Sequence, residues 1–167
     1  MIPEGGHVGS RHDFDFLMGT WSVHHHRLVN PLDPTCTEWV EFNSVATAHP
    51  ILDGMGNADD TSGALPDGGR FSGHSLRLYD PSRDIWRIWW ASISQPGVLD
   101  PPVEGRFTDG VGTFEGPFEQ DGRTIVARFC WRETHSLEPV WEQDFSFDGG
   151  RTWAPINWTM THTRVPG

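Results

Sequence analysis

The sequence predicts an all-β protein: an up-and-down antiparallel β-barrel of nine or ten strands, preceded by a short helical turn. Apolar and polar residues alternate in short stretches along the whole chain, and turn residues separate these stretches. The 19 Gly and 13 Pro among 167 residues would destabilise a mostly helical protein. A meander of this size leaves exposed sheet edges unless it closes on itself, so a barrel is expected.

The first half of the chain begins with one amphipathic helical turn over 12–18. Phe14, Leu17 and Met18 recur there at i, i+3 and i+4, and Gly19 ends the turn. Turn signals and β-favouring residues then predict three strands, at 20–29, 36–47 and 51–60, and a polar loop over 61–70. Two glycines in the third stretch weaken its strand pattern.

The second half contains the clearest hairpin, formed by strands 70–79 and 85–92. After a proline-rich crossing at 95–102, five more strands are expected, at 104–108, 112–119, 123–133, 140–147 and 152–165. The turn from Ser146 to Trp153 has an Asp-box pattern, in which Asp148 caps backbone N–H groups, and we interpret it as structural. We expect residues 1–11 to be a flexible segment and 12–167 to be a single domain.

Charge and composition exclude several classes of function. The net charge of −11 disfavours nucleic acid and anionic membranes as partners. All 12 basic residues are Arg, which excludes Schiff-base lysine chemistry and a phosphate-binding loop lysine. No apolar run reaches the ~18 residues of a membrane span, and the start of the chain lacks a charged-then-apolar leader. We therefore expect a cytoplasmic protein with Cys36 and Cys130 reduced.

Two stretches carry a family resemblance: Phe14-Asp15-Phe16-Leu17-Met18-Gly19-Thr20-Trp21 and Thr163-Arg164. Together they resemble the lipocalin-like (calycin) barrels, which open with a helical turn and a Gly-x-Trp. The resemblance implies that Trp21 plugs the closed end of the barrel and that Arg164 lies across it, a favourable cation–π pair. The ordered stretches HDFDFLMGTW, PILDGMGN, SLRLYDP, WEQDFSFDGGRTW and NWTM resemble, more narrowly, a bacterial lipocalin-like family of unknown function. That family implies an architecture but no reaction.

The aromatic content indicates what the barrel would contain. Nine Trp and ten Phe exceed what a small barrel needs for filling, so an aromatic-lined cavity for a small apolar molecule is expected. Alternatively, the rings only form cross-strand pairs. If Trp21 points inward, strand parity and residue type give the ligand-binding candidates Arg27, Trp39, Glu41, Tyr79, Trp86, Trp90, Phe129, Trp131, Trp141, Trp158 and Met160.

Charged residues among these aromatics have alternative interpretations. Glu41 shares the parity of Trp39 and could face either side, whereas Glu142 is expected to point outward and be solvated. Arg77 and Tyr79 share a face; they could anchor a ligand carboxylate or phenol, or pair with surface acids.

Histidines are the candidate catalytic groups. His24, His25 and His26 are consecutive and alternate between faces, so they cannot all bind one ion, and no metal site is expected. His25 and His162 are predicted to converge inside the barrel, where either could act as a general acid or base or be a core histidine. Some calycins, of the nitrobindin type, bind haem through a histidine on a late strand, so the resemblance makes haem at His162 a further alternative.

The leading hypothesis is therefore a cofactor-free binding module for an aromatic or polyene-like ligand. The alternatives are a cofactor-independent isomerase, cyclase or lyase that uses a cavity histidine, a haem protein, and a structural barrel with a protein-binding face. A homodimer stays open.

Overall fold

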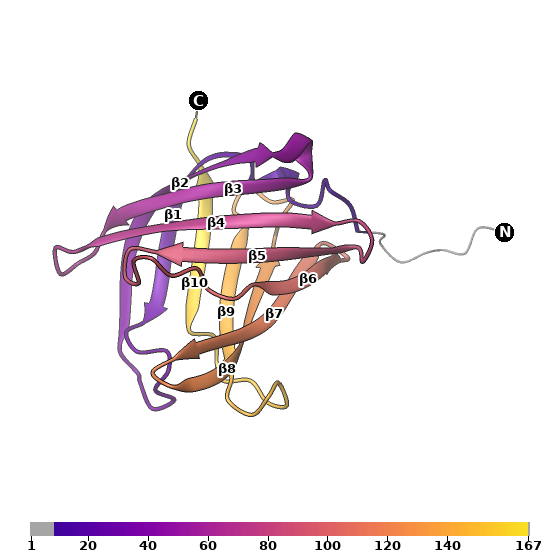
Figure 1. The fold of residues 1–167 in the computed structure, drawn as a ribbon. Coiled ribbons are helices and arrows are strands. Elements are labelled where there is room, and N and C mark those ends of the chain that lie inside the picture. Colours follow the sequence, from indigo (N-terminus) through magenta and orange to yellow (C-terminus); the bar gives the residue numbers. More distant parts are fainter. Residues whose placement is uncertain (1–8, 167) are drawn as a thin grey trace.

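Ten strands follow one another around a closed antiparallel barrel in the computed structural model, which describes residues 9–166 (Figure 1). The strands are β1 (Gly19–Leu28), β2 (Trp39–Ile51), β3 (Gly56–Ala64), β4 (Arg70–Asp80), β5 (Ile85–Ser92), β6 (Val103–Thr108), β7 (Val111–Gln120), β8 (Arg123–Arg132), β9 (Val140–Ser146) and β10 (Trp158–Arg164). The short 3-10 helices η1 (Asp15–Leu17) and η2 (Leu52–Gly54) are the only helical elements of the described residues. The predicted all-β barrel is confirmed.

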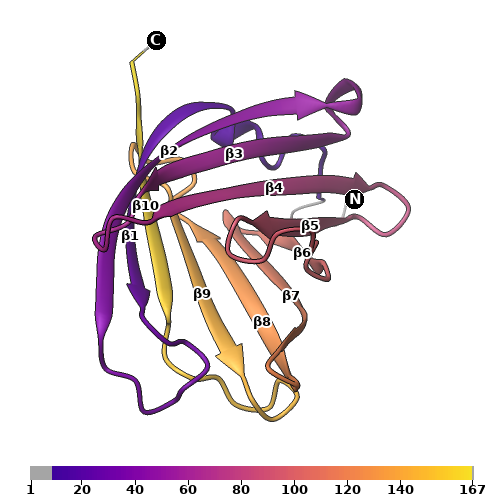
Figure 2. The same ribbon diagram turned by 60° about the vertical axis from the view of Figure 1, so that its left-hand side comes forward.

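Each strand pairs with its sequence neighbour, and β1 pairs with β10 to close the barrel. In that last seam Trp21 lies opposite Arg164, and Arg27 lies opposite Trp158. Figure 2 shows β7 to β10 running side by side down one wall, with β3 to β5 crossing at a steep angle on the other. Loops between β1 and β2, β3 and β4, β5 and β6, and β9 and β10 all lie at the end of the barrel away from η1, which we call the open end.

Three predicted strands have the wrong bounds. The second strand is Trp39–Ile51 instead of 36–47. The third strand begins at Gly56 instead of 51 and continues to Ala64, through part of the expected loop. Leu52 and Asp53 adopt left-handed backbone conformations, with φ of 51° and 54°, so they form η2 and cannot continue an extended strand. The last strand begins at Trp158 instead of 152, because the Asp148 turn is followed by irregular chain up to that point.

The closed end of the barrel is sealed by η1 and the residues that it touches. The indole Nε1 of Trp21 donates to the carbonyl oxygen of Leu17 at 2.7 Å. The guanidinium of Arg164 lies over the Trp21 ring, 4.1 Å from its centroid, and donates to the carbonyls of Met18 and Phe16 at 2.8 and 3.1 Å. Three orphan backbone carbonyls of this segment are therefore satisfied by side chains from the barrel wall.

Rings fill the half of the barrel beneath this seal. Phe14 is 1% exposed and meets Trp86 and Phe107 edge-on, with both centroid distances 5.0 Å. Phe114, which is fully buried, stacks on Phe14 from β7, the strand next to that of Phe107. This packing fills the closed end on the side of β5, β6 and β7.

The chain ahead of η1 is also attached to the barrel where it is described. The backbone N–H of Gly9 donates to the Asp84 carboxylate at 3.0 Å. The expectation of a flexible segment over 1–11 otherwise falls on residues 1–8, which lie outside the described residues. No helix within 9–166 combines the length and hydropathy needed to cross a membrane. Cys36 and Cys130 are free thiols.

Candidate functional site

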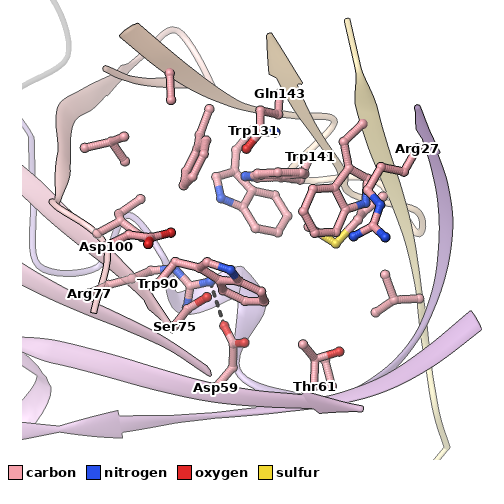
Figure 3. A pocket seen from close by; sticks show the side chains of 18 of the residues that line it. Arg27, Asp59, Thr61, Ser75, Arg77, Trp90, Asp100, Trp131, Trp141 and Gln143 are labelled. Atoms are coloured by element: carbon pink, nitrogen blue, oxygen red, sulfur yellow. Dashed lines mark ion pairs between the residues drawn. The ribbon is translucent and has the colours of Figure 1, made fainter. Parts of the chain in front are cut away.

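A cavity of about 240 Å³ occupies the barrel interior between the closed-end rings and the open end (Figure 3). Its walls carry five indoles, from Trp21 on β1, Trp90 on β5, Trp131 on β8, Trp141 on β9 and Trp158 on β10. Trp158 meets Trp141 edge-on with centroids 5.3 Å apart, and it meets Trp90 edge-on at 6.4 Å. The rings therefore meet at steep angles and present both faces and edges to the enclosed space.

Strand alternation explains why these rings point inward. On β8 the side chains of Ile125, Ala127 and Trp131 are buried, so the odd-numbered residues of that strand form the inner face. The same rule places even-numbered residues inside on β5 and β10. The structure brings eight of the predicted site residues to the cavity: Arg27, Trp90, Phe129, Trp131, Trp141, Trp158, Met160 and His162.

Trp39 and Glu41 do not face the cavity: the expected place of Trp39 in the ligand site is wrong, and Glu41, for which the sequence left both sides open, points outward. The inner face of β2 is formed by even-numbered residues such as Phe42 and Ser44, so both odd-numbered residues point outward. Trp39 is 40% exposed and stacks on the imidazole of His26, with centroids 4.2 Å apart. Glu41 lies 3.3 Å from His24 on the same outer face. Across the described residues, no group of three or more His, Cys, Asp or Glu is arranged to hold a metal ion.

Tyr79 and Trp86 point inward but lie at the closed end, beyond the cavity. Their predicted role as ligand-binding residues is therefore wrong. Trp86 is 1% exposed and belongs to the Phe14 ring cluster. The Tyr79 hydroxyl donates to the Asp84 carboxylate at 2.8 Å. Burial, together with that hydrogen bond and the nearby carboxylate charges, raises the pKa of Tyr79 to about 12, so the phenol stays protonated. The residue anchors the segment around Gly9 and is not available to a ligand.

His25 lies behind the cavity wall and does not line the cavity. Its side chain is fully buried, and both ring nitrogens are used. The Trp158 indole Nε1 donates to Nδ1 at 3.1 Å, so the remaining proton sits on Nε2, which donates to the Ser44 hydroxyl at 2.7 Å. Burial lowers the pKa of His25 to about 3, with the charges of His162 and Arg27 contributing. A neutral, doubly hydrogen-bonded imidazole is a positioning residue here, not an acid or base for a ligand.

His162 does line the cavity, near the closed end. Its ring packs between Trp131, with centroids 5.0 Å apart, and Trp21, at 6.1 Å. Nδ1 lies 3.2 Å from the Pro139 carbonyl oxygen, which fixes the proton on Nδ1. Burial lowers the pKa of His162 to about 4, so at neutral pH its Nε2 is an uncharged acceptor.

Haem does not fit against His162 in this arrangement. Two indoles flank the imidazole, and the space beside it is about 240 Å³, below the roughly 300 Å³ at which pockets for drug-sized ligands begin. A rigid porphyrin plane needs more room than such a ligand, so the function proposed below involves no haem chemistry.

A buried ion pair at the inner end of the cavity was missed by sequence reasoning. Asp59 Oδ2 and Arg77 Nη2 are 2.6 Å apart, and both side chains are nearly excluded from solvent. Arg77 also donates to the Asn57 amide oxygen at 2.9 Å and lies over the Phe14 ring. A signal did exist: in a strand Asp59 and Asp60 must face opposite sides, so one of the two had to be inside.

Two further charged groups line the open end of the cavity, one of which sequence reasoning missed. The guanidinium of Arg27 lies over the rings of Trp158 and Phe42, at 5.0 and 5.4 Å. Asp100 stands in the loop after β5 and was not predicted; its backbone N–H donates to the Trp90 carbonyl at 2.9 Å. Burial raises the pKa of the Asp100 carboxyl.

Glu142 departs from the sequence interpretation in its environment. The residue was expected to be solvated, but it is 6% exposed and forms an ion pair with Arg132 of the neighbouring strand. Its outward orientation follows from the inward Trp141 and Phe145 on either side along β9. This pair therefore belongs to the outer wall and contributes nothing to the cavity.

Comparison with known proteins assigns no family to this chain: no protein-family model matches it, and neither does any curated protein.

Proposed function

We propose that the protein is a lipocalin-like barrel that binds a small hydrophobic molecule, aromatic or polyene-like, in the cavity between β5, β8, β9 and β10. The observation that carries this proposal is the cavity of about 240 Å³ that remains among five indoles. A fold that needed these rings only for stability would interdigitate them to crystal-like density. Each aromatic contact with a planar ligand contributes about 0.5–1.5 kcal/mol beyond the area that it buries.

The size of the cavity limits the ligand. At about 240 Å³ it lies just below the roughly 300–1,000 Å³ range of pockets for drug-sized molecules. A fused pair of six-membered rings is a suitable probe, because it is flat enough to lie against Trp141 and Trp158 at once. 2-Naphthamide is an uncharged and fluorescent compound of this kind.

A titration with 2-naphthamide tests the proposal. We expect saturable binding of one molecule per chain, followed by naphthalene fluorescence. Ala127 lies on the inner face of β8 and lines the cavity, so Ala127→Phe fills the space and should weaken binding about tenfold or more. Ala91 lies on β5 at an outward parity position, and Ala91→Phe is the matched control that should leave affinity unchanged.

Equal affinity of the Ala127→Phe and Ala91→Phe variants would place the ligand outside the barrel and overturn the proposal. So would an absence of binding to the wild-type protein at the solubility limit of the probe.

Acid–base catalysis on the bound ligand is a second candidate function, favoured by the position of the neutral His162 imidazole at the cavity wall. With a pKa of about 4 the imidazole acts as a proton acceptor at neutral pH and not as a proton donor. If the protein catalyses such a reaction, we expect turnover to be lost in His162→Gln and kept in His25→Gln, because His25 does not line the cavity.

A further inference from the structure

Two guanidinium groups reach the cavity, and they differ in their partners. Arg77 is neutralised by Asp59 at 2.6 Å. Arg27 has no carboxylate within ion-pair distance and no hydrogen-bond acceptor among the residues that the structure describes. The cavity therefore contains one compensated cation and one uncompensated cation, the latter near the open end (Figure 3).

The contacts that Arg27 does make leave its donors free. Its guanidinium carbon lies 5.0 Å from the ring centroid of Trp158 and 5.4 Å from that of Phe42, and these rings offer its N–H groups no carboxylate or carbonyl acceptor. The N–H bonds of a guanidinium lie in its plane and match the two oxygens of a carboxylate. Trp158 is itself held by its hydrogen bond to His25, so one face of the stack is fixed in place.

An anion at Arg27 would remove an electrostatic cost. A partly buried cation without a partner is unfavourable, because it has lost water and gained no opposite charge. Burial accordingly lowers the pKa of Arg27 from its usual range. The protein bears this cost in the unliganded state, and an anionic ligand would offset it on binding.

The other charges limit that anion to a single negative charge. The chain has a net charge of −11, and Asp100 and Asp59 also line the cavity. Asp59 is neutralised by Arg77, so Arg27 is left to balance one negative charge of a ligand, and the second charge of a phosphate group would face Asp100 and the net negative charge of the chain. Figure 3 places Asp100 on the side opposite Arg27, with the indoles of Trp90 and Trp141 between them.

We propose that Arg27 makes this cavity selective for planar apolar molecules that carry one carboxylate, with the carboxylate bound to the guanidinium and the ring system lying across Trp141 and Trp158. This inference rests on the proposed binding function of the cavity and specifies the chemical class of its ligand.

A matched pair of probes separates the two claims. 2-Naphthoate and 2-naphthamide share a ring system and differ in charge. The wild-type protein should bind the naphthoate about tenfold or more tightly than the naphthamide, as expected for a hydrogen bond between charged groups. Arg27→Gln should abolish this preference, so that the variant binds the naphthoate no more tightly than the naphthamide. Arg106 is exposed on β6 and away from the cavity, so Arg106→Gln is the control that should retain it.

The outcomes are distinguishable. If both compounds bind the wild type with equal affinity, or if Arg27→Gln keeps the preference, the carboxylate inference is overturned while cavity binding stands. If neither compound binds, the proposed function fails and the inference with it. The wild-type comparison needs no variant, and urea unfolding of Arg27→Gln establishes that the variant used is folded.

Discussion

The indole nitrogen of Trp158 donates a hydrogen bond to Nδ1 of His25 across 3.1 Å, joining a cavity-lining ring on β10 to a fully buried imidazole on β1. The imidazole Nε2 in turn donates a hydrogen bond to the Ser44 hydroxyl, which also accepts one from the Thr61 hydroxyl at 2.8 Å. Thr61 again lines the cavity. One wall of the cavity is therefore held by a hydrogen-bonded chain that runs through four strands, β10, β1, β2 and β3.

Replacing His25 tests this chain. His25→Phe keeps a flat ring but removes the acceptor for Trp158 and the donor to Ser44, so buried polar groups lose their partners. We expect a loss of about 1–3 kcal/mol in the free energy of unfolding, measured by urea denaturation. His24→Phe, at the exposed neighbouring position, is the control and should change stability by less than about 0.5 kcal/mol. Equal effects of the two substitutions would show that the chain is not stabilising.

The buried histidines predict acid lability. Their pKa values in the folded protein are about 3 for His25 and about 4 for His162, both below the ordinary 6.5. Below pH 6.5 the unfolded chain binds protons that the folded chain does not, so stability falls as pH falls. Each histidine should contribute a loss of about 1.4 kcal/mol per pH unit between 6.5 and its folded pKa.

Denaturation curves at several values between pH 7 and pH 4 measure this slope. His162→Phe should make it shallower, whereas substitution of the exposed His135 should not. An unchanged slope in His162→Phe would contradict the assignment of a buried neutral imidazole.

Removing one partner of the Asp59–Arg77 pair should lower the free energy of unfolding strongly, whereas replacing both partners by apolar residues should lower it only slightly. Asp59→Asn leaves the guanidinium of Arg77 buried with no countercharge, and we expect a loss of about 3–5 kcal/mol in the free energy of unfolding. The double variant Asp59→Leu with Arg77→Met removes both charges and should recover most of that loss. A double-mutant cycle in urea measures the coupling. Additive effects would mean that the two side chains do not interact in solution.

Arg164 should stabilise the closed end. Arg164→Gln removes the cation over Trp21 and two hydrogen bonds to the η1 segment. Because the side chain is largely exposed, we expect a loss of only about 1–2 kcal/mol in unfolding free energy. Arg151→Gln, at an exposed turn position, is the control. A stability change equal to that control would show that the closed end holds without this contact.

Local sequence patterns predicted most of the barrel because strand alternation and turn chemistry act over a few residues. Both ends of the strand at 85–92 are predicted correctly, because turns flank the strand and its inward residues alternate regularly. The strand expected at 51–60 begins only at Gly56, because η2 precedes it. This short helix requires left-handed backbone conformations at Leu52 and Asp53, and side chains other than glycine rarely adopt them. Parity then placed Trp90, Trp131, Trp141 and Trp158 in the cavity once the inward direction of Trp21 was assumed.

The remainder of the site depends on tertiary placement that alternation does not contain. Parity tells which face a residue shares but not its height along the barrel, so Tyr79 and Trp86 were expected in a cavity that begins above them. The inward direction of β2 is set by its register with β1, where Phe42 lies opposite His25, and that register excluded Trp39 and Glu41. Asp59 and Asp100 become site residues only when distant strands and loops meet.

A crystal structure of the protein with 2-naphthoate would show directly whether the cavity binds a planar carboxylate at Arg27. We expect electron density for the naphthalene inside the barrel against Trp141 and Trp158, with the carboxylate oxygens within hydrogen-bond distance of the Arg27 guanidinium. Naphthalene density on the outer surface, with indoles collapsed into the interior space, would contradict this expectation.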